Sequence, residues 1–234
     1  MNRRLALHPI AIRGFTLHEV LIACIIVSIL AVLLAPAVNQ GRRSAENAGC
    51  LSNLRQLFNA ANYYAIDNFN HFPDSRYWQE PASNSFASSW TLAPYLNLTS
   101  ALESGTKTVY TCPTAEAKSP STRSFKRTYS MSQYAGYTFN GVAQNLPKPP
   151  SLAALAVFMD GVIANSGEYY SYATEGHMRS GASPGEQFPH NNQMNVVFGD
   201  GHVESLVKEY AQKYLSENRI RVPFWGGDQP SLLK

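Results

Sequence analysis

Residues 14–38 read G-F-T-L-H-E-V-L-I-A-C-I-I-V-S-I-L-A-V-L-L-A-P-A-V, and the rest of the chain is organised around this stretch. From Val20 to Val38 the only mildly polar residues are Cys24 and Ser28. A helix needs roughly 20 apolar residues to cross the hydrocarbon core of a bilayer. The run therefore predicts a membrane-spanning helix near the N-terminus.

Glu19 stands at the start of this run, where a carboxylate is costly and usually has an assigned partner. One simpler alternative is a plain signal anchor in which Glu19 is incidental. Another is a secretory signal peptide, because Ala35-Pro36-Ala37 has the small-x-small form of a cleavage site. Against the signal peptide, the apolar run is longer than a typical h-region and Pro36 lies inside the proposed site.

The hexapeptide Gly14-Phe-Thr-Leu-x-Glu19 followed by an apolar run resembles the N-terminal cleavage/methylation motif of type IV prepilins and type II secretion pseudopilins. The resemblance implies that a prepilin peptidase/N-methyltransferase cuts after Gly14 and methylates Phe15. It further implies that Glu19 pairs with the N-terminus of a neighbouring subunit, and that Pro36 is the proline which many such helices carry. His18 departs from the family, which usually has an aliphatic or small residue there.

The net charge of +3 belongs to the first 14 residues. Three of the 19 basic residues lie there without any acid, which leaves 16 bases against 16 acids in the rest of the chain. Nucleic acid as the main partner would need a basic face, so none is expected. The leader arginines favour a cytoplasmic N-terminus, although Arg42 and Arg43 beyond the span weaken that asymmetry.

The segment after the span predicts a helix with one apolar face. Small and apolar residues recur at steps of three and four between Ala45 and Ala65, and polar residues fill the other positions. We therefore expect one long helix from Phe15 to about Ile66. Its outer half must pack on something, because an apolar stripe is not left in water.

Short strands are expected in the remainder of the chain, with an Asp-Gly hairpin as the clearest signal. Asp200-Gly201 would form a two-residue turn with both residues at positive φ, placing Gly199 opposite His202 and Val197 opposite Glu204. The other expected elements are strands at 109–112, within 128–140 and at 155–159, and a closing helix at 208–218.

His190, nine intervening residues and then Asp200-Gly201 resemble the H-x9-DG C-terminal signature of a large pseudopilin-like family. In the structural interpretation, the imidazole of His190 makes hydrogen bonds to the backbone, and these fix the loop that leads into the hairpin. Several other segments also look like that family: Cys50–Gln56, Trp90–Leu96, Cys112-Pro113 and Val197–Val203. The resemblance implies a membrane-anchored, pilin-like subunit with a mostly β head.

The three cysteines fall into two groups. Cys24 lies in the apolar run and reads as a small apolar filler. Cys50 and Cys112 lie in the body, which the topology places in an oxidising compartment, so they form either a disulfide or two buried free thiols. The sequence leaves both alternatives open.

A metal-binding alternative rests on Asp160, His190, Asp200 and His202, whose side chains suit a hydrolase-like His/Asp site. His190 and Asp200 are ten steps apart, so a bend must bring them together, and the turn already explains Asp200. The chain has no G-x-S-x-G, P-loop or G-x-G-x-x-G motif. No enzyme activity and no cofactor are expected. Among metals the resemblance favours calcium over zinc, because major secretion pseudopilins hold calcium in a C-terminal loop.

Together these observations predict an α+β protein in which a long N-terminal helix packs on a small antiparallel sheet. The expected segments are a leader at 1–14, a transmembrane and assembly helix at 15–40, and a periplasmic or extracellular head at 41–234. The expected function is a structural subunit of a type IV pilus-like or type II secretion pseudopilus-like filament. Before assembly the chain would be anchored in the inner membrane, and afterwards its N-terminal helix would contact other pilin-like subunits. The alternatives are a membrane-anchored or secreted binding protein for a solute or glycan, and a metal-dependent hydrolase.

Overall fold

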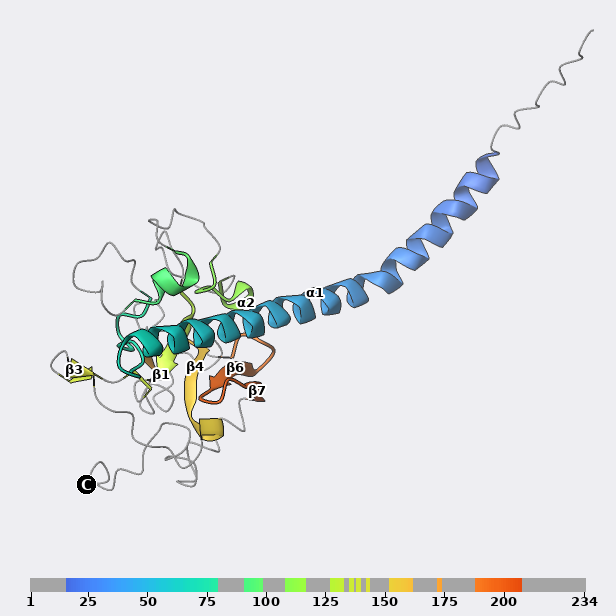
Figure 1. The fold of residues 1–234 in the computed structure, drawn as a ribbon. Coiled ribbons are helices and arrows are strands. Elements are labelled where there is room, and N and C mark those ends of the chain that lie inside the picture. The colour runs from blue at the N-terminus through green and yellow to red at the C-terminus, as the bar shows by residue number, and fades with distance from the viewer. Residues whose placement is uncertain are drawn as a thin grey trace, which may run out of the picture. The chain divides into compact units, whose positions relative to one another are not determined.

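A computed structural model describes residues 16–79, 91–98, 108–116, 127–132, 135–136, 138–139, 142–143, 152–161, 172–173 and 188–207 (Figure 1). The chain divides into two compact units, Met1–Arg42 and Arg43–Lys234. The second unit holds the sheet and the hydrophobic core. The expected helix at 208–218 and Trp90 lie outside the described residues.

Helix α1 runs from Leu17 to Asp67 without interruption, although Pro36 lies inside it. The predicted helix from Phe15 to about Ile66 is therefore confirmed for the described residues. The helix ends at a turn in which Phe69 and Asn70 both have positive φ. The Asn70 N–H donates to the carbonyl of Ala65, and this bond closes the C-terminal end of the helix.

Four antiparallel strands form the sheet of the head: β1 (Tyr129–Ser132), β4 (Ala156–Asp160), β6 (Gln193–Phe198) and β7 (Val203–Val207). The sheet order is β5-β1-β4-β6-β7, in which the two-residue β5 (Tyr172–Ala173) pairs parallel to β1. A separate ribbon pairs β2 (Thr138–Phe139) with β3 (Val142–Ala143). Short 3-10 helices η1 (Ala93–Leu96) and η2 (Leu152–Ala154) and a short helix α2 (Pro113–Glu116) complete the described elements. The predicted α+β fold with a small antiparallel sheet is confirmed.

The core lies between the outer half of α1 and one face of the sheet, as Figure 1 shows for the part of α1 nearest β1, β4 and β6. The buried helix residues recur at steps of three and four: Cys50, Leu54, Leu57, Phe58, Ala61 and Tyr64. They pack with Met131, Phe158 and Val197 of the sheet. Burying one large apolar side chain stabilises the fold by roughly 1.5–3 kcal/mol. The amphipathic pattern at 45–65 thus finds its partner in the sheet.

The predicted hairpin between β6 and β7 is present, but its register differs from the expectation by one residue. Val197 pairs with Val203 and Val196 with Glu204, so Gly199 does not oppose His202. The loop has three residues, and only Gly201 has a positive φ, of 88°. This is the arrangement of a three-residue hairpin loop with a left-handed glycine at its end. The expectation of positive φ at Asp200 is therefore wrong.

The strand expected at 109–112 is also absent from the described structure. Residues 109–110 form a turn and Pro113 begins α2, where its missing N–H costs nothing because first-turn donors have no helical partner. The Cys112 N–H instead donates to Thr128 Oγ1 at 2.6 Å, and the Thr128 N–H donates to the Tyr110 carbonyl. One side-chain and one backbone hydrogen bond to Thr128 thus hold this segment in place of a sheet ladder.

Candidate functional site

The first turn of α1 contains a reciprocal cap between Thr16 and Glu19. Both the N–H and the hydroxyl of Thr16 donate to Glu19 Oε2 at 2.8 Å, and the Glu19 N–H donates to Thr16 Oγ1 at 3.3 Å. This is a capping box, which satisfies N-terminal backbone donors that the helix leaves unpaired. In a single chain the Glu19 carboxylate is therefore bound within its own helix. Gly14 and Phe15 lie outside the described residues.

Apolar side chains cover the helix that follows, and they are exposed. Leu17, Val32 and Val38 are 88%, 74% and 67% exposed, and the other large apolar residues of this stretch are more than 40% exposed. An 18-residue window has a mean hydropathy of 3.0 and none of its residues is buried in the structure. By length and composition this part of α1 is able to span a membrane.

The spacing of the H-x9-DG motif follows from the geometry of β6. His190 and Gln193 exchange both backbone hydrogen bonds across Asn191 and Asn192, whose φ angles of 53° and 65° are those of a type I′ turn. Strand β6 begins at Gln193 and ends at Phe198, and the three-residue loop ends at Gly201. The motif therefore places one turn at each end of a single strand.

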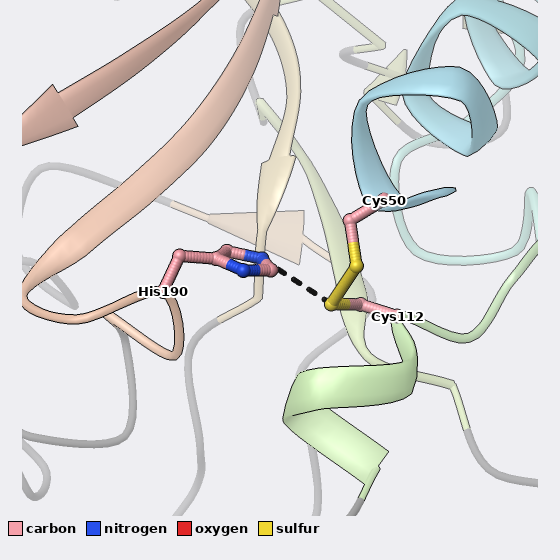
Figure 2. Close-up of side chains that lie close together, drawn as sticks. All are labelled: Cys50, Cys112 and His190. Carbon is pink, nitrogen blue, oxygen red and sulfur yellow. Dashed lines mark hydrogen bonds between the residues drawn. A yellow bond between two sulfur atoms is a disulfide. The ribbon is translucent and has the colours of Figure 1, made fainter. Parts of the chain in front are cut away.

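At the His190 end, the imidazole contacts a disulfide. Nε2 of His190 lies 3.3 Å from Cys112 Sγ, and Cys112 is bonded to Cys50 with a Cα–Cα distance of 5.0 Å (Figure 2). Figure 2 shows that Cys50 comes from α1 and Cys112 from the start of α2. Both cysteines are fully buried, and the side chain of His190 is 4% exposed. The His190 ring was expected to bind backbone groups; its contacts are instead a sulfur atom and a carboxylate.

That carboxylate belongs to Asp160, at the end of β4. Its Oδ2 lies 3.4 Å from His190 Nε2 and accepts the Asn195 N–H at 2.6 Å. Burial of the Tyr129 phenol, and then the charge of the neighbouring Asp160, raise the pKa of the phenol well above its usual value. The phenol is therefore neutral. The Tyr129 hydroxyl donates to the Cys50 carbonyl at 3.3 Å, which connects β1 to α1.

Asn195 lies in β6 and links that strand to α1 through its side chain. Its Nδ2 donates to Asn47 Oδ1 at 2.8 Å, and its Oδ1 accepts the Ser205 hydroxyl at 2.6 Å. Asn195 is fully buried, so each of these bonds satisfies a group that would otherwise be costly. Sequence reasoning missed Asn195 and Asn47. The only sequence signal was an Asn inside the otherwise apolar run Met194–Phe198.

At the other end of the motif, Asp200 and Gly201 form the hairpin loop against α1. Asp200 Oδ1 accepts the His202 N–H at 3.1 Å and contacts the His202 ring. Desolvation, the largest single influence, favours the protonated acid, but the hydrogen bonds from the backbone and ring of His202 together outweigh it and lower the pKa of Asp200. Gly201 lies over Phe58 of α1: a Cβ at this position would be 3.0 Å from Phe58 Cε1.

The four metal candidates from the sequence do not form one site. Asp160 pairs with His190 before β6, and Asp200 pairs with His202 after it. Among the described residues, the group that could hold a metal ion contains Cys50, Cys112 and His190, a set that the sequence did not suggest.

Three residues along β6 and its two turns each contact α1 or a residue bonded to it. They are His190 before the strand, Asn195 within it and Gly201 after it. We call these three contacts the β6 clamp.

Part of the chain is similar to a known protein. The chain is 34% identical over 61 residues to the Type II secretion system core protein G of Escherichia coli (strain K12). The match covers 26% of this chain and 41% of the length of that protein. No family model matches the chain, and no solved structure matches it. The similarity is to a component of a secretion system and covers less than half of it.

Proposed function

We propose that this chain is a structural subunit of a pilus-like or pseudopilus-like filament that assembles through its N-terminal helix. One observation carries the proposal: α1 is a continuous helix whose first part is apolar and exposed, whereas its second part buries one apolar face in the head. Such a helix serves as a membrane anchor in a single chain and as a packing surface between chains. The partial similarity to a type II secretion core protein supports this assignment.

Glu19 is the residue that this function would use most directly. In a single chain its carboxylate accepts both donors of Thr16, so the charge is satisfied while the helix is in the membrane. In a filament the N-terminal ammonium of a neighbouring subunit would replace or join Thr16 as its partner, since an unpaired carboxylate among apolar helices is costly. The partner ammonium would belong to Phe15 after the leader is removed.

Processing is the first expected outcome. In a cell that has a prepilin peptidase/N-methyltransferase, the mature chain starts at Phe15 with a methylated N-terminus. Gly14→Val leaves the leader in place, because the peptidase requires a small residue before the cut. Intact-mass analysis of the membrane-extracted chain measures both. A mature start near Val38 would identify a secretory signal peptide instead, and a start at Met1 would identify a plain anchor.

Assembly is the second expected outcome. Glu19→Ala still inserts in the membrane, because loss of a charge makes the span more apolar. Its yield in sheared filaments should fall by at least about tenfold, which corresponds to 1.4 kcal/mol of lost pairing. Thr16→Ala is the matched control: it removes one donor to Glu19 but retains the carboxylate, so filaments should still form. Equal filament yields from Glu19→Ala and wild type would show that Glu19 does not set the register of assembly. A wild-type chain that forms no filaments would favour a membrane-anchored protein that never polymerises.

A further inference from the structure

The buried side chains around the disulfide form a set of donor atoms. The ligand atoms of Cys50, Cys112 and His190 lie within 4.8 Å of one another. Nε2 of His190 is 3.3 Å from Cys112 Sγ and 3.4 Å from Asp160 Oδ2. In a tetrahedral zinc site with metal–ligand bonds of about 2.0–2.3 Å, neighbouring ligand atoms are separated by about 3.3–3.8 Å. The two distances to Nε2 already lie at this spacing.

Asp160 adds an independent observation. The residue is 1% exposed, and its Oδ1 has no hydrogen-bond partner among the residues that the structure describes. A buried carboxylate oxygen without a partner is costly, and the commonest compensations are a paired charge or a metal. Its other oxygen is held by the Asn195 N–H, which orients the carboxylate toward His190 as outer-sphere groups do in metal sites.

We propose that, when the Cys50–Cys112 bond is reduced, the two thiolates and His190 bind one Zn²⁺ ion. Asp160 lies beside His190 but outside the group whose ligand atoms are within 4.8 Å of one another, so it becomes the fourth ligand by a shift of its side chain. Two sulfurs, one imidazole nitrogen and one carboxylate oxygen form a donor set that suits zinc, whereas calcium prefers six to eight oxygens. All four side chains are buried, as in closed structural sites rather than catalytic sites with an open position.

The chemistry requires a reductant and releases protons. A phosphine reductant breaks the S–S bond by transferring two electrons: the phosphorus takes the oxygen of a water molecule, and the two sulfurs become thiols. Binding of Zn²⁺ then displaces one proton from each thiol into solvent, because the thiolate is the metal ligand. Disulfide and zinc are thus mutually exclusive. In either state α1 stays linked to the start of α2; in the zinc state the ion also links β4 and the turn before β6.

The test uses the full chain in detergent micelles, without a histidine tag and with Cys24→Ser to remove the third thiol. The chain is reduced anaerobically, the phosphine is removed, and a thiol assay verifies two thiols per chain. We expect one Zn²⁺ per reduced chain and none in the disulfide-bonded chain. Co²⁺ in place of Zn²⁺ should show thiolate-to-cobalt bands and intense tetrahedral d–d bands. At a free Zn²⁺ concentration about 100-fold above Kd, the Tm of the reduced chain should rise by about 5–10 °C.

Three variants identify the ligands. His190→Gln should weaken Zn²⁺ binding by more than about 100-fold, the upper end of what loss of an outer-sphere partner causes. Asp160→Asn should weaken binding and alter the Co²⁺ bands. His71→Gln makes the same chemical change outside the cluster and should bind as wild type does. Absence of zinc binding by the reduced chain would overturn the proposal. So would wild-type affinity in His190→Gln, or equal binding by the disulfide-bonded chain. The wild-type Co²⁺ spectrum reports ligand number even where a variant folds poorly, and the readout does not depend on filament assembly.

Discussion

Reduction of the Cys50–Cys112 disulfide is expected to lower the free energy of unfolding by about 4 kcal/mol. The bond joins residues 62 apart in sequence, and in the chain-entropy model closure of a loop of this length restricts the unfolded chain by that amount. Both sulfurs are buried where α1 meets the start of α2, so the cross-link holds the outer helix on the head. Loss of the bond therefore weakens the packing of the outer half of α1 on the head, where the core lies.

Thermal unfolding of the full chain in detergent measures this effect. With a phosphine reductant and a chelator, the Tm should fall by roughly 8–16 °C, since 1 kcal/mol shifts the Tm of a protein of this size by about 2–4 °C. The chelator prevents metal binding by the released thiols. A Cys50→Ala/Cys112→Ala variant should melt near the reduced protein and ignore the reductant. Cys24→Ser should respond as wild type does, because Cys24 is free and exposed. Three reactive thiols in the denatured, unreduced chain would show that the bond is absent.

The long helix and the hairpin were predictable because their signals are local. Apolar residues between Val20 and Val38 fix the first half of α1, and the three- and four-residue steps from Ala45 to Ala65 fix its second half. Asp200-Gly201 between two apolar runs is a strong hairpin signal. The one-residue error in register arose because Asp-Gly also ends three-residue loops, and the choice depends on the φ of Asp200 in the folded chain.

The environment of His190 was not predictable, because its contacts are distant in sequence. Cys112 lies 78 residues before it, and Asp160 lies 30 residues before it on a different strand. Only the antiparallel pairing of β4 with β6 brings Asp160 beside the turn that carries His190. The sequence showed which residue types could form a polar cluster. The pairs that they form depend on the order of strands in the sheet, which no local pattern encodes.

The β6 clamp gives the H-x9-DG motif a structural explanation. Strand β6 lies between β4 and β7 in the sheet. The type I′ turn positions His190 beside the disulfide, and the three-residue loop positions Gly201 against Phe58. A chain with one residue more or fewer between the two turns would move one of these contacts off α1, because successive residues of a strand point to opposite faces.

Gly201→Val is expected to be the most damaging single substitution in the motif. Gly201 has a φ of 88°, a conformation that β-branched residues rarely adopt. A Cβ there would be 3.0 Å from Phe58 Cε1, so the helix or the loop must move. Backbone strain and overpacking each cost about 1–3 kcal/mol, so together they lower the free energy of unfolding by roughly 2–6 kcal/mol. Asp200→Asn is the matched control, with an expected loss below about 1 kcal/mol, because an amide oxygen can also accept the His202 N–H.

A double-mutant cycle separates the two causes. Gly201→Ala keeps the positive φ problem and adds the smallest Cβ, whereas Phe58→Leu removes the ring atom that this Cβ would contact. If the contact dominates, Gly201→Ala should cost less in the Phe58→Leu background than in wild type, and the difference is the coupling energy. If backbone strain dominates, the two losses add. Thermal melts of the four chains, each with and without chelator, separate the two causes.

The same kind of melt tests the structural role of the loop itself. A stable Gly201→Val variant, together with a chelator-sensitive wild type and a strongly destabilised Asp200→Asn variant, would contradict that role and point to a metal at the loop.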